Sequence, residues 1–461
     1  MSDSYATSVK KESPIDTPIT ETTDAPANAA TAESGGFLAK FKSLDWNFIR
    51  GSSFNSLGIA IARVLGFAFS FVVARALNST EDYGYVVYVI TLAGVVAVLT
   101  QPFGQHVMAY LIGKNHKDED QRNAAMDNAW TVMIGLMFVT LLVGVPVLMA
   151  LQRFSIELMV VFIGITCFYT YYGISSGFLA SGRLLAAYLG SNLVQILLIV
   201  LVVMILEQNE TPVPALIIYG LAYFLPMALL IAFAPLPVRF RLGRDWQRIR
   251  QIVSFSVPIW LSHILYIAYF STDILMLEAF SDNSAVGVYG LTKTLSSAFH
   301  FIPGGITLVL MPKIAGLPKE DHGKYLMTSI GVSLLVNFIG GVIYMALYQW
   351  FIINFFGAEY FIGLDFGFLM AFGAILTGIH GVISAVMIGS GRTTQNTISR
   401  AAMLMAMLSL GFLLIPTQGA MGAAFTILGA ATAGLLTFVV LYIAERRLQF
   451  FTPKAQPDAM L

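Results

Sequence analysis

Residues 75–92 read RALNSTEDYGYVVYVITL, and residues 279–295 read AFSDNSAVGVYGLTKTL. In each stretch an apolar run ends in a short polar segment, and a second apolar run begins around a glycine, Gly84 or Gly287. Polar residues allow the backbone to turn in water, so each stretch is expected to connect two apolar helices. The recurrence of one pattern in both halves of the chain indicates an internal repeat.

The composition indicates a membrane protein. Of the 461 residues 57% are hydrophobic and 11% are charged, and the mean hydropathy is +0.76. Soluble domains contain about 25% charged residues, and a soluble fold of this size could not hide so much apolar surface. The 26 basic and 26 acidic residues balance, so no basic excess indicates nucleic acid. A single cysteine, Cys167, excludes an internal disulfide and a cysteine-based zinc cluster.

Twelve apolar runs have roughly the 20 residues that a helix needs to cross a bilayer. None shows the ten-residue alternation of a membrane β-barrel. We therefore expect an all-α integral membrane protein with about twelve transmembrane helices. The runs lie at 51–77, 83–112, 128–151, 156–178, 185–206, 213–235, 252–280, 286–311, 325–352, 363–388, 396–415 and 420–444.

Lysines and arginines concentrate in alternate connections between these runs. The opposite connections hold only Arg153, with Arg75 at the edge of the first run. Because cytoplasmic loops carry the basic excess, this distribution predicts a multi-pass protein of the inner or plasma membrane with both termini in the cytoplasm.

A basic stretch, PVRFRLGRDWQRIRQ at 237–251, divides the runs into two sets of six. A second motif also recurs, because Ser181-Gly182-Arg183 is matched by Ser390-Gly391-Arg392 between the fourth and fifth runs of each set. Six spans per repeat would relate two lobes by a pseudo-twofold axis along the membrane normal. Convergence is the alternative, since Gly and Arg are common at cytoplasmic turns. The predicted parts are a disordered cytoplasmic tail at 1–45, an N-terminal lobe at 51–235, a linker at 236–251, a C-terminal lobe at 252–444 and a cytoplasmic tail at 445–461.

Motifs for enzymatic chemistry do not stand out. The sequence contains no Walker loop and no HExxH motif, so it encodes neither direct use of ATP nor that kind of metal site. The predicted outer loops are at most about 15 residues long, which leaves no room for a soluble catalytic domain. No cofactor and no metal are expected.

Several stretches resemble one family in their order and spacing. They are Asn55, Arg63 and FVVARALNSTEDYG (71–84) in the first half, and Pro258, DILMLEAFSDNSAVGVY (273–289), PKIAG (312–316) and GAMGAAF (419–425) in the second. Together they resemble the polysaccharide and O-antigen flippases of the multidrug/oligosaccharidyl-lipid/polysaccharide exporter superfamily.

The resemblance implies two lobes around a polar cavity. It implies that a polyprenyl-pyrophosphate-linked oligosaccharide moves from the cytoplasmic to the outer leaflet for export of lipopolysaccharide O-antigen or exopolysaccharide. An H⁺ or Na⁺ gradient rather than ATP would drive the step. The implied partners are this lipid-linked glycan, the bilayer, and polysaccharide polymerase or export proteins.

Charges inside the apolar runs are candidate site residues, because a lone charge in lipid costs several kcal/mol. Arg63 shares a helical face with Asn55 and Ser70. Its guanidinium could grip a pyrophosphate by two parallel hydrogen bonds. The alternative is a structural ion pair or a contact with backbone carbonyls.

Lys293 and Asp273 are expected at similar depth in neighbouring spans. A local ion pair is one interpretation. The other has Asp273 bind a proton or a cation in one state and pair with Lys293 in the other. Tyr289, Ser296 and His300 recur on the face of Lys293, so His300 joins Asp273 as a candidate for ion coupling.

Further candidates for sugar or pyrophosphate binding lie elsewhere. Arg400 could gate the cargo or reach toward lipid headgroups. Gln101 and Gln105 flank Pro102 and could bond sugar hydroxyls. Tyr169, Tyr171 and Tyr172 could stack on sugars, or serve in packing or in an aromatic belt at the membrane interface.

Three functions compete at this point: a flippase, a cation-coupled multidrug exporter of the same superfamily, and a membrane enzyme of polysaccharide assembly. Within the runs the basic residues Arg63, Lys293 and Arg400 outnumber the deep acid Asp273. That balance favours an anionic cargo and hence the flippase.

Overall fold

A computed structural model of the chain describes residues 61, 64–77, 79–98, 119–150, 155–179, 211–233, 242–300 and 319–451, with isolated positions within 196–205 and 303–314. Every regular element in these ranges is a helix, as expected for an all-α protein. Five of the described helices are long and apolar enough to cross a membrane. They are Asn123–Ala150, Ser256–Phe280, His322–Phe355, Gly363–Gly389 and Thr393–Ala444.

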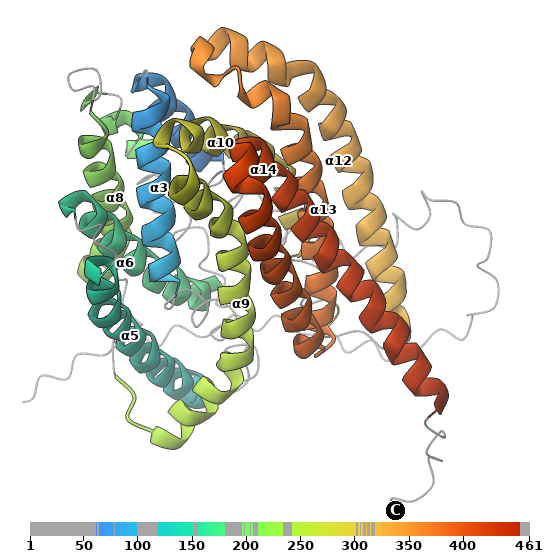
Figure 1. Cartoon of the computed structure of the whole chain (residues 1–461). Coiled ribbons are helices and arrows are strands. Elements are labelled where there is room, and N and C mark those ends of the chain that lie inside the picture. Colours follow the sequence, from blue (N-terminus) through green and yellow to red (C-terminus); the bar gives the residue numbers. More distant parts are fainter. Residues whose placement is uncertain are drawn as a thin grey trace, which may run out of the picture. The chain divides into compact units, whose positions relative to one another are not determined.

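The described elements follow the order of the predicted spans (Figure 1). A helix at Val64–Ala76 comes first. It is followed by α3 (Thr80–Ala97), α5 (Glu119–Ala150), α6 (Ile156–Leu179), α8 (Pro212–Phe233), α9 (Trp246–Phe280), α10 (Asn283–Ser296), the 3₁₀ helix η1 (Ser297–His300), α12 (Lys319–Phe355), the 3₁₀ helix η2 (Ala358–Tyr360), α13 (Gly363–Gly389) and α14 (Thr393–Phe451).

The helix α14 covers two of the predicted spans, 396–415 and 420–444. Its backbone leaves helical geometry at Gly419, where φ is 55° and ψ is −130°. A positive φ favours glycine, and Pro416 just before it lacks a backbone N–H. The break therefore lies between the two predicted spans. The full count of twelve stays a prediction, because 51–60, 99–112 and most of 185–206 lie outside the described residues.

The eighth predicted span, 286–311, is not one uninterrupted α-helix. Its first α-helix, α10, ends at Ser296 and passes into η1, and the described positions within 303–310 are α-helical again. The hydroxyl of Ser297 donates to the carbonyl of Thr294 at 2.6 Å. Side chains that bond nearby carbonyls in this way compete with α-helical hydrogen bonds. The helix therefore tightens here, and His300 lies on a 3₁₀ turn rather than on α10.

The polar segments of the two quoted stretches begin helices. The Ser79 hydroxyl accepts a hydrogen bond from the Asp82 N–H at 3.3 Å and caps α3. The Asp282 carboxylate accepts from the Ala285 N–H at 2.8 Å and caps α10. Side-chain oxygens at this position satisfy N–H groups that the first helical turn leaves unpaired. In both quoted stretches, therefore, the polar segment supplies the N-terminal cap of the helix that follows.

Helices from the same half of the chain pack on one another. In the first half α6 packs on α8 and on α3, and in the second half α14 packs on α9 and on α13 (Figure 1). Between the two halves, the most extensive contact of the described helices joins α3 to α10. This helix pair therefore forms the main described junction between the halves.

Two glycines allow α3 and α10 to approach closely. A Cβ atom on Gly84 would overlap the backbone oxygen of Asn283, and a Cβ on Gly287 would overlap the backbone oxygen of Thr80. Beside this crossing the hydroxyls of Thr80 and Ser284 hydrogen-bond at 2.6 Å. Small residues are the usual means by which membrane helices bring their backbones together.

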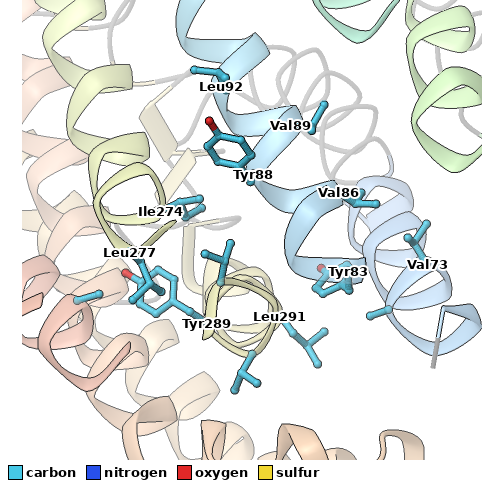
Figure 2. Packing of buried hydrophobic residues seen from close by; sticks show 14 of the residues in the cluster. Val73, Tyr83, Val86, Tyr88, Val89, Leu92, Ile274, Leu277, Tyr289 and Leu291 are labelled. Carbon is cyan, nitrogen blue, oxygen red and sulfur yellow. The ribbon is translucent and has the colours of Figure 1, made fainter. Parts of the chain in front are cut away.

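Buried apolar side chains surround the crossing. Figure 2 shows Tyr83 and Val86 of α3 on the side of the preceding helix, which carries Val73. In the same view Tyr289 of α10 lies beside Leu277 of α9. All five side chains are at most 3% exposed. The core of the described residues is therefore continuous from the first half into the second.

The outward surface of α12 is apolar. Phe338 is 71% exposed and Met327 is 68% exposed, with many further large apolar side chains on the same helix. In water such a surface would be a liability, whereas lipid tails solvate it without cost. This helix therefore fits a position at the boundary with the bilayer.

The glycine crossing makes a matched pair of substitutions informative. Gly84→Ala should destabilise the protein by about 2 kcal/mol, because the new methyl group meets backbone atoms that cannot move aside. Gly94→Ala on the same helix should be neutral or stabilising by up to about 1 kcal/mol, since no atom lies within 4 Å of its Cβ position. Thermal unfolding of the two purified variants in detergent measures the difference. Equal midpoints would show that α3 and α10 do not cross at Gly84.

Candidate functional site

An ion pair joins α9 to α10. Lys293 Nζ lies 2.8 Å from Asp273 Oδ1 and 2.6 Å from Oδ2, and it also donates to the carbonyl of Phe270 at 2.5 Å. The Asp273 side chain is fully buried, while that of Lys293 is 16% exposed. Asp273 and Lys293 therefore lie in contact, as their predicted depths indicate.

Two further donors hold the Asp273 carboxylate. The backbone N–H of Ile274 donates to Oδ1 at 2.9 Å, and the Tyr289 hydroxyl donates to Oδ2 at 2.5 Å. A buried carboxylate is tolerated when several donors satisfy its lone pairs. Asp273 would thus keep two hydrogen bonds if Lys293 moved away. Helical periodicity predicts that Tyr289 shares a face with Lys293, but it does not predict the hydrogen bond from Tyr289 to Asp273.

A cavity of about 390 Å³ opens beside the ion pair. Its second-half wall contains Lys293, Asp273, Ser296 and His300, and the His300 ring lies 5.5 Å from that of Phe270. The cavity thus collects both predicted ion-coupling residues and one predicted substrate-binding residue.

The first-half wall of the cavity carries aromatic and hydroxyl side chains among apolar ones. It includes Ser70, Tyr83, Thr91 and Tyr169. The two walls differ in character, because both charged side chains belong to the second half. Aromatic rings and hydroxyls are the groups that bind sugars by stacking and hydrogen bonding. Ser70 and Tyr169 are among the candidates that the sequence indicates, whereas Tyr83, which adjoins Gly84 in the stretch 75–92, is not.

The predicted tyrosine group divides. Tyr169 lines the cavity, whereas Tyr171 packs in a separate apolar cluster with Trp130 and Cys167. The side chain of Tyr172 lies outside the described residues. Of the two described members, one lines the cavity and the other lies in the apolar cluster.

Arg400 belongs to a different polar cluster, which joins α9, α13 and α14. Its guanidinium donates to the Ser262 carbonyl at 3.1 Å and to the Ser384 hydroxyl at 3.2 Å, and it lies 4.8 Å from the centre of the Tyr266 ring. Asn396 completes the cluster by donating to the Ser262 hydroxyl at 2.8 Å and accepting from Ser384. Arg400 is not among the residues that line the cavity. Its predicted role as a gate or as a contact to lipid headgroups stays a prediction.

Four predicted site residues, Arg63, Asn55, Gln101 and Gln105, lie outside the described residues. Their roles stay predictions. Within the described part of the chain, no group of three His, Cys, Asp or Glu side chains is arranged to hold a metal ion.

Comparison with known protein families identifies one match. The family described as "Polysaccharide biosynthesis protein" matches residues 48–317, which is more than half of the chain. The matched segment includes both quoted stretches and the pair Asp273–Lys293. No curated protein matches the chain in sequence.

Solved structures share the fold. The lipid II flippase MurJ in an inward closed conformation has a TM-score of 0.66 at 14% identity, over 87% of this chain and 88% of that one. An inward-facing multidrug resistance MATE family transporter of the MOP superfamily has 0.64 at 14% identity, over 85% and 96%. An outward-facing MATE transporter has 0.54 at 14% identity, over 88% and 96%.

The ion pair can be tested by a double-mutant cycle. Asp273→Asn leaves Lys293 without a countercharge and should cost about 3 kcal/mol of unfolding free energy. Lys293→Met should cost a similar amount, whereas the double variant should lose less than the sum. Chemical unfolding in detergent gives the four free energies, and Asp365→Asn, an exposed acid on α13, is the control. Strictly additive losses would contradict a direct pair.

Proposed function

We propose, from the premise that the chain belongs to the polysaccharide biosynthesis protein family, that it is a flippase for a polyprenyl-pyrophosphate-linked oligosaccharide. The cargo would pass from the cytoplasmic to the outer leaflet of the inner or plasma membrane and supply O-antigen or exopolysaccharide synthesis. In this proposal the chain is a secondary transporter and not an enzyme.

One observation carries the proposal: Lys293 lines a cavity between apolar helices, and the opposite wall of that cavity carries tyrosine and hydroxyl side chains. Lys293 could donate to the pyrophosphate, and Tyr169, which is partly exposed, could contact the sugar across the cavity. The volume of about 390 Å³ falls within the usual range for ligand pockets. The polyprenyl tail would remain in lipid, where it needs no polar contact.

We assign the coupling step to Asp273. The anionic cargo competes with Asp273 for Lys293, and a proton or a Na⁺ ion replaces Lys293 at the carboxylate. Tyr289 and the Ile274 N–H keep the carboxylate in place during this exchange. Either cation would neutralise the charge that Lys293 leaves behind. His300 lines the same cavity and could relay a proton.

Alternating access between two six-helix lobes would move the cargo. The N-termini of α3 and α10 meet at Thr80 and Ser284, which closes this junction at the end predicted to face outward. The higher TM-scores to inward structures than to an outward-facing one support the same state. Opening of this junction would then release the cargo to the outer leaflet.

The remaining predicted residues have different roles in this proposal. Arg63, with Asn55 on its predicted face, would grip the pyrophosphate, and Gln101 and Gln105 would bond sugar hydroxyls. The contacts of Arg400 favour a structural role between α9, α13 and α14 in the present state.

A cation-coupled multidrug exporter is the second candidate, because the fold is shared with MATE transporters. A buried acid such as Asp273 is typical of a site for cationic drugs. The lysine paired with it favours an anionic cargo instead. A membrane enzyme of polysaccharide assembly would instead be shown by incorporation of labelled sugar into polymer by the purified protein alone.

Transport in proteoliposomes tests the flippase directly. The purified protein should move a labelled polyprenyl-pyrophosphate oligosaccharide between leaflets when an H⁺ or Na⁺ gradient is applied. Lys293→Ala should lower the rate by about tenfold or more, because it removes a charge-assisted hydrogen bond to the pyrophosphate. Lys324→Ala, an exposed lysine on α12, is the control.

Unfolding midpoints separate a folding defect from a transport defect in these variants. A Lys293→Ala protein that folds and transports at the wild-type rate would refute the assigned role of Lys293. Transport of cationic drugs without transport of the lipid-linked oligosaccharide would favour the exporter.

A further inference from the structure

A second cavity lies between the helix Val64–Ala76 and the segment 354–360, and the cargo proposal does not use it. Its volume is about 710 Å³. Phe71 and Arg75 line it from the helix, and Asn354, Glu359 and Tyr360 line it from the segment. By the distribution of basic residues this end of the helices faces outward.

Arg75 places a positively charged guanidinium in the wall of this cavity, with N–H groups that can still donate hydrogen bonds. The side chain is exposed, and Nη1 donates to the carbonyl of Phe355 at 2.7 Å. A guanidinium carries five N–H donors, so most remain available to a ligand. Among the ion pairs of the described residues, none involves Arg75.

Glu359 brings an anion to the same cavity. Its Oε2 accepts from the backbone N–H and from the hydroxyl of Thr80, each at 3.3 Å. Both bonds use one carboxylate oxygen, which leaves Oε1 for a ligand. The described ion pairs do not join Glu359 to Arg75, although both side chains line one cavity. Two opposite charges therefore face the same space without neutralising each other.

Aromatic side chains form the rest of the wall. The ring centre of Phe71 lies 5.1 Å from that of Phe356 and 5.9 Å from that of Phe355, and Tyr360 lies 5.3 Å from Phe356. The Trp350 ring of α12 is 55% exposed, and its centre lies 5.6 Å from that of Phe355, which lines the cavity. The cavity therefore adjoins an exposed apolar surface of α12 on which acyl chains can lie.

We propose that this cavity binds the headgroup of a phospholipid that carries both a phosphate and a primary ammonium, as in phosphatidylethanolamine. The phosphate bonds Arg75, the ammonium donates to Glu359, and the acyl chains follow α12. A headgroup that carries only negative charge would offer no cation to the Glu359 carboxylate. A choline headgroup has no N–H to donate.

The site also joins the two halves of the chain. Arg75 precedes α3, whereas Glu359 lies in η2 between α12 and α13. A bound headgroup would therefore bridge the halves next to Thr80, where α3 and α10 meet. Such a lipid stabilises the arrangement in which this junction is closed.

Native mass spectrometry of the purified full chain tests the proposal with three lipids of identical acyl chains. Wild-type protein should bind phosphatidylethanolamine about fivefold or more tightly than phosphatidylglycerol or phosphatidylcholine, because only its headgroup satisfies both charges. Equal affinity for the three lipids would overturn the proposal. The proposal concerns a bulk lipid rather than the cargo, so failure of the transport assay leaves it standing.

Two variants assign the contacts. Arg75→Gln should lower the affinity for phosphatidylethanolamine by about tenfold. Glu359→Gln should abolish the preference over phosphatidylcholine, and its amide oxygen can still accept from Thr80. Arg250→Gln, an exposed arginine on α9, is the control. Unchanged preference in Glu359→Gln would contradict the ammonium contact.

Arg75→Lys keeps the positive charge and covers the case in which Arg75→Gln fails to fold. It should retain the preference for phosphatidylethanolamine with a modest loss of affinity. Loss of the preference in a folded Arg75→Lys protein would contradict a phosphate contact that depends on charge.

Discussion

The close approach of α3 and α10 is the constraint on which the described structure depends. Gly84 and Gly287 have no side chains, so the two backbones meet where any Cβ would overlap main-chain atoms. Because the helices come from different halves of the chain, this contact positions one half against the other. The cavity beside Lys293 has walls from both halves, so its shape follows from the same crossing.

The two charged side chains that line the cavity differ in exposure. Asp273 is fully buried and accepts from Tyr289 and from a backbone N–H in addition to Lys293. Lys293 is partly exposed to the cavity and can be attracted by another anion. A pair with one fixed and one accessible member suits the proposed transport step, because a cargo could attract Lys293 while two hydrogen bonds hold Asp273 for an incoming cation.

Much of this arrangement could be predicted from local patterns, and the remainder could not. Two equivalent helix starts followed from the repeated polar segments, and the proximity of Asp273 and Lys293 followed from their equal depth in neighbouring spans. The contact of Gly84 with the second half is tertiary, so helical periodicity within one segment could not show it. The predicted depth of Arg400 in its span did not indicate that its side chain contacts Ser262 rather than the cavity. Depth along a span does not specify which helix lies beside it.

A reversible cross-link tests most directly whether the junction of α3 and α10 must open during transport. The hydroxyl oxygens of Thr80 and Ser284 are 2.6 Å apart, so cysteines at both positions are placed to form a disulfide, and the native Cys167 is buried. Alternating access predicts that the oxidised Thr80→Cys, Ser284→Cys protein does not move lipid-linked oligosaccharide in proteoliposomes, and that reductant restores the rate. Equal rates for the cross-linked and the reduced protein would contradict it.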